Sequence, residues 1–374
     1  MATLTHAAFR SVVEKFGSCD EYYSEMINAG TFVTGGPFEK YYIIPDPVPE
    51  KMVWQITGRK TEHIVRAAEM IAALPGRGID INMGCSAPEI MKSGAGAAWL
   101  TRDKAETREM ISSVHNVLHH AVHSAAPASG GGLKRHKRLS VKLRLGDEHF
   151  TDNTLFALCD MLVEEGVEQF ALHARTSKEK YRTPPRWEYV EKLCARYSGQ
   201  HVSIVLNGNV RDVASLNAAL KVAPHIDGIM IARAAVERPW VFATLRTSLQ
   251  MADALQTLAA LHKENALHAA STPQMRNAAH IERQPAPPNE RGQQSLIVDR
   301  EQTALDFIDF LERYQPQAFW KTRLQRFFAY YCAQFLFAHY FTTRMLNAKN
   351  LDDARKQVRN YFVKQPSEKL LALM

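Results

Sequence analysis

The segment Asp80–Cys85 (DINMGC) is followed closely by Gly94–Ala98 (GAGAA), and together they indicate how the chain folds. Apolar residues lead into an asparagine, a glycine and a cysteine, and a helix-like run then begins. This pattern is typical of a buried parallel strand that delivers polar side chains to the mouth of an α/β barrel, where the chemistry of such proteins is done. Only one of the five cysteines, Cys85, ends such a strand, so it is the first candidate for a reactive thiol.

Short β-rich runs recur along the chain, and most are followed by an amphipathic helical pattern. We expect seven strands, at residues 22–26, 52–55, 79–82, 140–143, 170–173, 202–207 and 228–231. We expect helices between them at 61–74, 104–119, 153–165, 187–197 and 210–222. This alternation predicts an α/β protein with a parallel sheet, specifically a TIM (β/α)8 barrel.

A closed barrel of this kind needs eight strands, so one is missing from the count. It should be the first, because Thr5–Arg10 already has the character of a helix start. We therefore expect Met1 to lie at the end of strand one, with the true start of the protein upstream. An in-frame stop codon just before Met1, with no apolar codons, would contradict this hypothesis.

The composition narrows the class of protein. Of 374 residues, 46% are hydrophobic and 23% charged, as in ordinary globular proteins. Apolar runs fall short of the roughly 20 residues of a membrane helix, and the start lacks a secretory pattern. The cysteines are scattered, without a C-x-x-C pair, which argues against disulfides and zinc. We expect a cytoplasmic, monomeric protein with no metal and no membrane contact.

The charge is uneven along the chain. The net charge is +7, and residues 300–374 alone carry 12 Lys+Arg against 7 Asp+Glu. A basic surface of this kind favours a polyanionic partner. We expect a barrel domain over 1–245, a helix and flexible linker or insertion over 246–300, and a small all-helical domain over 301–374.

The last domain should contain helices at 302–314, 318–346 and 351–363, the final one capped by Asn350 or Asp352. A second insertion, Ser124–Gly132 (SAAPASGGG), runs into the basic residues 134–138, which we interpret as a solvated loop. The aromatic residues of the second helix follow helical spacing and therefore belong to the core: Phe327, Phe328, Tyr331 and Phe335.

Several polar residues end successive predicted strands. Lys142 lies within an otherwise apolar strand, where burial is costly without an anion or an electron-rich ring beside it. His173 and Asn207–Asn209 end the next two strands, and Arg233 opens a helix after the last, where TIM barrels commonly bind phosphate. Each residue alone has an ordinary structural explanation, and a lone cysteine is usually a small buried hydrophobe. Their joint placement indicates a single site, at which the Cys85 thiol could donate a proton.

These residues resemble a known family, the tRNA-dihydrouridine synthases, which carry FMN in a TIM barrel and have a C-terminal helical domain. The similar segments follow the barrel in order: Tyr23–Ile27, Gln55–Gly58, Asp80–Cys85 with Gly94–Gly96, Val141–Gly146, His173–Thr176 with Tyr181, Asn207–Asn209, and Met230–Arg233 with Pro239–Trp240. Two departures are Ser86, where the family often has proline, and Ala232, where it usually has glycine.

The resemblance implies FMN as cofactor, NADPH as electron donor and tRNA as substrate. It implies catalytic roles for Cys85 as proton donor, Lys142 and His173. The implied FMN contacts are Met1, Ala2, Gln55, Asn82, Lys142, His173, Asn207, Gly208, Asn209, Ala232 and Arg233; the Met1–Ala2 contact depends on the missing strand. Asn82 should face the uracil or the flavin, and the expected substrate contacts are Asn82, Arg175, Arg323, Arg326, Arg355 and Arg359.

The function implied is FMN-dependent reduction of the C5–C6 double bond of specific uridines in tRNA. Such an enzyme must bind a base outside its stack and hold RNA phosphates in a salt-sensitive way. One alternative is an FMN barrel reductase acting on a small molecule, similar to dihydroorotate dehydrogenase, which would not need the basic helical tail. Another is an RNA-binding protein without enzyme activity on a degenerate barrel.

Overall fold

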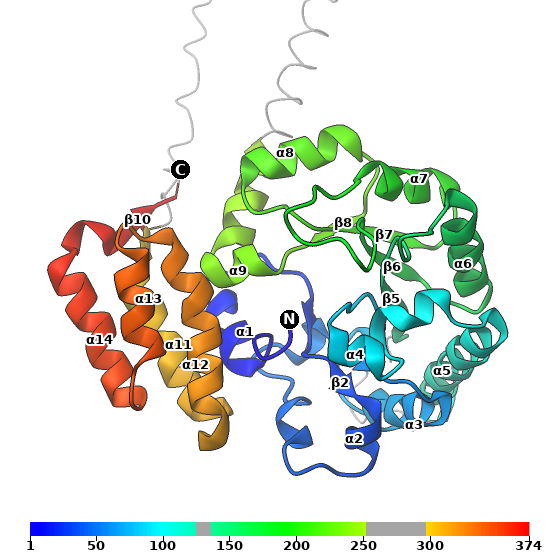
Figure 1. Ribbon diagram of the computed structural model, residues 1–374, viewed down its shortest axis with the longest axis horizontal. Helices are drawn as coiled ribbons and strands as arrows, with labels where there is room; N and C mark the ends of the chain where they lie inside the picture. The colour runs from blue at the N-terminus through cyan, green and yellow to red at the C-terminus, as the bar shows by residue number, and fades with distance from the viewer. Residues whose placement is uncertain (125–135, 252–296, 374) are drawn as a thin grey trace, which may run out of the picture.

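The computed structural model describes residues 1–124, 136–251 and 297–373. The predicted Ser124–Gly132 insertion and most of the predicted 246–300 linker lie outside the described residues. Figure 1 shows two units side by side, a barrel-like α/β unit and a smaller helical unit. None of the described helices is long and apolar enough to span a membrane.

A parallel sheet forms the centre of the larger unit, and its strands pair with their neighbours in chain order. All seven predicted strands are present, the first as two short pieces that both pair with β3. Among the described residues, no strand lies between β8 and β1, so the ladder stays open where strand one of a closed barrel would lie. The strands are β1 (Tyr22–Tyr23), β2 (Ile27–Asn28), β3 (Met52–Thr57), β4 (Gly78–Met83), β5 (Arg138–Arg144), β6 (Gln169–His173), β7 (Ser203–Asn207) and β8 (Gly228–Met230).

The register of the sheet aligns the carboxyl ends of these strands. Asn82 pairs with Lys142 across β4 and β5, and Arg144 pairs with His173 across β5 and β6. His173 pairs in turn with Asn207 across β6 and β7. Every residue of β3, β4 and β6 is buried, as expected for strands covered on both faces. Polar side chains in these strands must therefore find partners inside the protein.

Helices alternate with the strands and cover the outside of the sheet (Figure 1). Two of them begin with a capping box, in which Thr151 or Asp212 and the residue three positions later bond reciprocally. The five predicted helices are confirmed with small shifts at their ends. The helices of this unit include α1 (Ala7–Glu14), α2 (Ala29–Val33), α3 (Thr61–Ala72), α4 (Pro88–Lys92), α5 (Lys104–Ser124), α6 (Asp152–Glu164), α7 (Glu188–Arg196), α8 (Val213–Val222) and α9 (Arg233–Glu237).

The smaller unit contains α11 (Arg300–Tyr314), α12 (Gln317–Tyr331), α13 (Ala338–Leu346) and α14 (Leu351–Lys364), beside a short antiparallel pair of β9 (Ile297–Asp299) with β10 (Leu370–Ala372). Asn350 caps α14 by accepting a hydrogen bond from the Asp353 amide, as predicted. The single helix predicted over 318–346 is wrong, because the chain leaves the helix after Tyr331 and turns at extended Phe335. Phe335 is buried against Tyr331 and Phe341, and this packing favours the turn over a straight continuation.

An aromatic core holds the helical unit together, as the helical spacing of these residues predicted. Phe327, Phe328 and Tyr331 are fully buried. The Phe327 ring stacks on Phe307 of α11 with a centroid distance of 3.7 Å, and on Tyr331 at 5.1 Å. These rings stabilise the fold and are not available to stack on bases.

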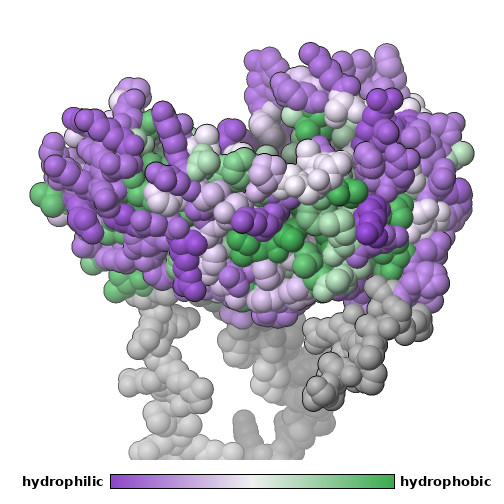
Figure 2. Space-filling view, turned by 90° about the horizontal axis from the view of Figure 1, so that it is seen from below, coloured by the Kyte–Doolittle hydropathy of each residue, from purple (hydrophilic) through white to green (hydrophobic). Residues whose placement is uncertain are grey.

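The two units share an extensive interface. Helix α1 packs along α11. The Phe9 ring of α1 also lies 6.5 Å from the ring of Phe327, which belongs to α12. Seen from below, the outline dips between the helical unit and the barrel, and hydrophobic residues gather toward the middle of this face (Figure 2). The helical unit therefore lies against the barrel near the N-terminal segment.

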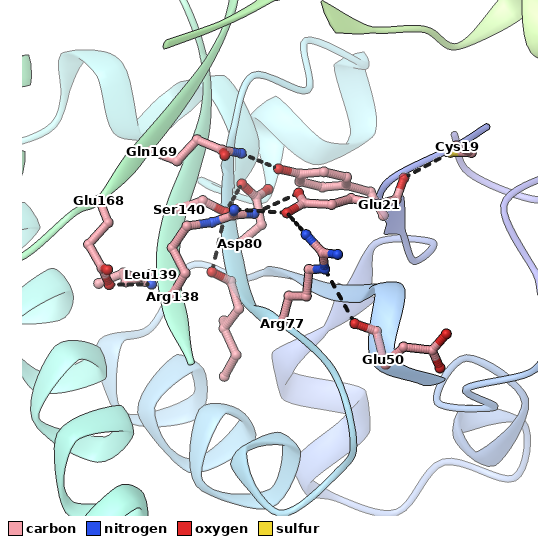
Figure 3. A network of polar contacts seen from close by, with 12 residues as sticks. Cys19, Glu21, Glu50, Arg77, Asp80, Arg138, Leu139, Ser140, Glu168 and Gln169 are labelled. Atoms are coloured by element: carbon pink, nitrogen blue, oxygen red, sulfur yellow. Dashed lines mark hydrogen bonds and ion pairs between the residues drawn. The ribbon is translucent and has the colours of Figure 1, made fainter. Parts of the chain in front are cut away.

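A polar network ties the amino ends of β4 and β5 to the segment that precedes β1 (Figure 3). Arg138 donates two hydrogen bonds to the Glu21 carboxylate, at 2.9 and 2.7 Å. Arg77 lies beside the same carboxylate at 3.5 Å. Interactions at the amino ends of barrel strands serve stability rather than chemistry, so we assign this network to the fold.

We expect Phe327→Ala to destabilise the protein by about 3–5 kcal/mol, because it removes a fully buried ring from four aromatic contacts. Chemical denaturation followed by fluorescence would measure the change. The matched control is Phe337→Ala, whose ring is 47% exposed, with an expected change below about 1 kcal/mol. Equal effects of the two substitutions would contradict the assignment of Phe327 to the core.

Candidate active site

Cys85 lies just after the carboxyl end of β4, and its side chain is partly exposed. The other four cysteines are buried, and burial raises the pKa of Cys19 and of Cys194 to about 12. Burial also raises the pKa of Cys159 and Cys332. Cys85 is therefore the one cysteine placed for chemistry with a ligand, as the sequence predicted.

Two side chains hold the peptide group that joins Gly84 to Cys85. The Asn82 side-chain oxygen accepts the Cys85 N–H at 2.9 Å. From the neighbouring strand, the Arg144 Nε donates to the Gly84 carbonyl at 2.8 Å. The same guanidinium donates to the Thr176 carbonyl at 2.9 Å, which joins the Cys85 loop to the loop after β6. The thiol thus sits on a loop whose backbone is fixed from two strands.

A chain of hydrogen bonds continues from Asn82 into the barrel. Asn82 Nδ2 donates to Gln55 Oε1 at 2.9 Å, and Gln55 Nε2 donates to Asp80 Oδ2 at 2.8 Å. Ser140 donates to the other Asp80 oxygen at 2.9 Å. Burial raises the pKa of Asp80 to about 6, although these hydrogen bonds oppose the shift. Both predicted cofactor residues, Gln55 and Asn82, are therefore held rigidly, with part of their hydrogen-bonding capacity left.

Lys142 reaches the same region from β5. Burial and, to a smaller extent, the nearby Arg144 guanidinium lower the pKa of its ammonium to about 7, although Asp80 acts in the opposite direction. No carboxylate forms an ion pair with this ammonium anywhere in the described parts of the chain. A cation that is paired with no anion in the protein is suited to receive a ligand with negative charge.

His173, at the end of β6, is held by a neighbouring arginine. Arg175 Nη1 lies 2.7 Å from His173 Nε2, and a guanidinium only donates, so the imidazole proton must be on Nδ1. Burial, Lys142 and Arg144 lower the pKa of His173 to about 2. The imidazole is therefore neutral and presents its Nδ1–H as a donor.

Arg175 itself is fully buried and bonds only to groups of the protein. Besides His173, it donates to the Thr183 carbonyl at 2.6 Å and to the Asn209 side chain at 3.1 Å. The sequence predicted that Arg175 contacts the substrate. In the structure Arg175 is buried, and it supports His173 and the loop after β6 instead. Its place in a short motif beside a site histidine gave no signal of this role.

The last two strands bring a glycine turn and an arginine to the same mouth. Gly208 has φ +117°, and a Cβ there would lie 2.9 Å from the His173 ring, so glycine is required for this approach. Ala232 precedes α9, and Arg233 opens it with an exposed side chain. The Arg233 guanidinium lies 4.3 Å from the Tyr181 ring centroid, and Tyr181 also faces His173. Asn207 donates to the Met230 carbonyl at 2.8 Å.

The N-terminal segment also reaches this mouth. Burial lowers the pKa of the Met1 amino group, which also lies near Glu25 and Lys142. Ala2 is exposed. Met1 and Ala2 therefore lie on the side of the barrel where the sequence placed a cofactor contact.

The four arginines expected to contact RNA in the helical unit have different environments. Arg323 is buried in an ion pair with Glu25. Arg355 pairs with Asp309, Glu312 and Asp352. Arg326 and Arg359 are exposed. In this conformation only the last two face solvent, which the sequence pattern did not distinguish.

A thiol, an ammonium group, a neutral imidazole donor and an exposed guanidinium thus converge at the carboxyl ends of an open (β/α) barrel. This fold is typical of barrel enzymes, and the group of residues is suited to an anionic ligand beside a potential proton donor. Three residues of this region carried no assigned role from the sequence, namely Asp80, Arg144 and Glu25. The only sign of a role in the sequence was that each of them is a charged residue in or beside a predicted buried strand.

Comparison with known proteins identifies the family. The family model described as dihydrouridine synthase (Dus) matches residues 1–283, so the chain belongs to the dihydrouridine synthase family. This confirms the predicted resemblance and favours it over the small-molecule reductase.

Individual relatives carry names of the same kind. A probable tRNA-dihydrouridine synthase of Aquifex aeolicus is 29% identical over 65% of this chain and 69% of its own length. The tRNA-dihydrouridine(16) synthase of Cupriavidus necator is 32% identical over 52% of this chain and 54% of its own length. The tRNA-dihydrouridine(47) synthase [NAD(P)(+)] of Cryptococcus neoformans is 26% identical over 66% of this chain and 33% of its own length.

We expect a thiol reagent to modify one cysteine rapidly in the native protein, because Cys85 alone is partly exposed. Absorbance of the released chromophore would count the reacting thiols. Cys85→Ser should abolish the fast phase, and the other four thiols should react only after unfolding. A second thiol that reacts at a comparable rate in the native protein would contradict the assignment.

Proposed function

We propose that this protein reduces the C5–C6 double bond of uridine in tRNA, with FMN as cofactor, NADPH as electron donor and Cys85 as proton donor. The observation that carries the proposal is the convergence of the partly exposed Cys85 thiol with Lys142 and His173 at one barrel mouth. Membership of the dihydrouridine synthase family supports the choice of substrate. The name of the Cryptococcus relative supports a nicotinamide donor.

The residues at the mouth fit a flavin mononucleotide. Lys142 has no anionic partner among the described residues and would face the electron-rich edge of the flavin ring. His173 would donate from Nδ1, since Arg175 occupies its Nε2. Gly208 leaves the space a close ligand needs, and Arg233, whose guanidinium lies against the Tyr181 ring, would bind the phosphate.

Bound FMN, once reduced by NADPH, would supply the hydride for uracil C6. Cys85 would give its thiol proton to C5, so that hydride and proton together saturate the double bond. The hydrogen bonds that Asn82 and Arg144 form with the Gly84–Cys85 peptide group would hold the thiol in position before the substrate binds. Asn82 has remaining capacity to bond the uracil edge. The free cysteines fit a reducing compartment, and we propose the cytoplasm.

RNA binding would fall to the exposed basic residues of the helical unit. Arg326 and Arg359 are the candidates that stay exposed, and phosphate contacts of this kind make affinity fall with salt. The target uridine would have to leave its stack to reach Cys85. The aromatic residues of the helical unit are buried in its core, so the exposed basic residues would be the main source of affinity for RNA.

We expect Cys85→Ala to abolish dihydrouridine formation in tRNA while NADPH still reduces the bound flavin, because the thiol serves only the proton transfer. Mass spectrometry of tRNA from a strain lacking the gene, complemented with wild type or variant, would measure the product. Stopped-flow absorbance would measure flavin reduction. Unchanged dihydrouridine in the strain without the gene would overturn the proposed function.

We expect Lys142→Met to weaken FMN binding by about 10- to 100-fold, as for loss of a charged hydrogen bond. The pKa of Lys142 is about 7 in the folded protein and 10.5 unfolded, so the unfolded chain binds more protons between these values. The cofactor-free wild type should therefore gain stability as pH rises from 7 to 10.5, and Lys142→Met should lack this gain.

Flavin titration followed by fluorescence, and thermal melting of the cofactor-free proteins at pH 7 and pH 10, would test both statements. Lys137→Met is a control for flavin affinity only, because Lys137 donates to carbonyls at the amino end of the barrel, away from the mouth, and burial lowers its own pKa to about 8. If Lys142→Met binds flavin as tightly as the wild type does, the Lys142 ammonium is not part of the cofactor site.

A further inference from the structure

One buried ion pair joins the two units of the protein. Glu25 belongs to the segment between β1 and β2, and Arg323 lies on α12, 298 residues further along the chain. Arg323 Nη1 lies 3.2 Å from Glu25 Oε1, and Nη2 donates to Oε2 at 3.3 Å. Only 3% of either side chain is exposed. No other ion pair of the described chain has both members this deeply buried.

The barrel side of this pair is fixed to the strands that carry the site. Ser24 donates to the Glu25 carbonyl at 2.8 Å, and the same hydroxyl accepts the Gln55 N–H at 2.9 Å. The Gln55 side chain bonds Asn82, which in turn holds the Cys85 amide. A short chain of hydrogen bonds therefore connects the Glu25 segment to the backbone of the thiol.

The helical side of the pair is fixed by aromatic rings. The Arg323 guanidinium lies 4.8 Å from the Phe319 ring centroid of its own helix and 6.0 Å from that of Tyr42 in the barrel unit. Phe319 also contacts Phe38 of the barrel unit, with ring centroids 4.8 Å apart. One turn of helix further on, α12 presents the exposed Arg326. Arg326 Nε donates to the Thr3 hydroxyl of the barrel unit at 3.2 Å, so the placement of α12 also sets the position of Arg326.

Such a pair costs solvation energy and specifies geometry more than it adds stability. The rest of the interface is largely apolar, as the contacts of Phe9 and Phe327 show, and apolar contacts tolerate sliding because they have no direction. Arg323 donates one hydrogen bond to the Glu25 carboxylate, and a second nitrogen lies 3.2 Å from the other oxygen, so this charge-assisted contact has a preferred direction. Other directional contacts cross the interface, namely Lys15 with Asp306 and Gln334 with the Glu237 carbonyl, but among the described residues the Glu25–Arg323 pair is the most deeply buried ion pair.

We propose that Glu25 and Arg323 are positioning residues, which fix the RNA-binding helix α12 relative to Cys85 so that a bound uridine reaches the thiol. This inference rests on the proposed function. It assigns Arg323 to the orientation of the helical unit, whereas the sequence had assigned it to RNA contact. Glu25 and Arg323 touch neither flavin nor RNA and act through the placement of α12.

The test separates the two halves of the reaction. NADPH reduction of bound flavin needs only the barrel, whereas reoxidation of reduced flavin by saturating tRNA needs correct placement of the uridine. We expect Glu25→Gln to leave flavin reduction within about two-fold and to slow tRNA-dependent reoxidation by about 10- to 100-fold, as small misplacements do. The matched control is Asp306→Asn, which removes the exposed ion pair of α11 with Lys15 of α1 and should change neither rate.

Salt dependence distinguishes positioning from direct RNA contact. Arg326→Gln should weaken tRNA binding and reduce the slope of log affinity against log salt by about one, as expected for one lost phosphate contact. Arg323→Lys should slow reoxidation at saturating tRNA without changing that slope. A reduced slope in Arg323→Lys, with full activity in Glu25→Gln, would identify Arg323 as an RNA ligand and overturn the proposal.

A double variant separates positioning from stability. Glu25→Gln alone leaves a buried guanidinium unpaired, so the variant should melt at a lower temperature or fail to fold. Glu25→Gln with Arg323→Met removes both charges and should recover most of the melting temperature. We expect tRNA-dependent reoxidation to stay slow in the double variant. Recovery of that rate together with stability would show a structural role only and would overturn the proposal.

Failure of this inference differs from failure of the proposed function. If wild-type protein with reduced flavin is not reoxidised by tRNA at all, the proposed function fails. If the wild type is reoxidised and Glu25→Gln and the double variant behave like it, only the positioning role fails.

Discussion

An excess of positive charge at the carboxyl ends of the strands governs the rest of the site. Lys142, Arg144, Arg175 and Arg233 all lie around His173, and together with burial they lower its pKa to about 2. The same environment lowers the pKa of Lys142 to about 7. Repulsion of this kind is costly in a protein without ligand and is relieved by an anion. The positive charge of the barrel mouth is thus suited to an anionic ligand, as the proposed function requires.

Within this mouth, the reactive group lies on a loop, and rigid strands hold the loop. Asn82 and Arg144 bind the two sides of one peptide group, and they come from the carboxyl ends of the neighbouring strands β4 and β5. Asp80 extends the support into the core through Gln55. A site built in this way keeps its geometry without ligand, because each supporting side chain is itself hydrogen-bonded. Precision at Cys85 therefore comes from the sheet rather than from the loop.

Much of this could be predicted from the sequence, for identifiable reasons. Strands that are buried on both faces are rich in β-branched and apolar residues, so all seven were found. The break between α12 and α13 was missed, because helical periodicity continues through Cys332–Phe337 while the packing of Phe335 forces the turn. Cys85, Lys142 and His173 were predicted as site residues because polar residues at strand ends stand out, and the structure places them at the same end of the sheet. Which residues they contact depends on register and on neighbours distant in sequence, and no local pattern contains that information.

The arginines show this limit most clearly. A count of basic residues predicts RNA contacts, yet several arginines of this protein hydrogen-bond to its own backbone and hold segments of it together. Arg10 donates to the carbonyls of Thr5, Ile44 and Asp46, and Arg144 and Arg175 bond carbonyls of other loops. A guanidinium has five donors in a fixed plane and can bind several carbonyls at once. At the mouth, Arg144 joins the loop after β4 to the loop after β6, and Arg175 joins the loop after β6 to the loop after β7. Arginines that bridge neighbouring loops in this way hold the shape of the mouth while they add to its positive charge.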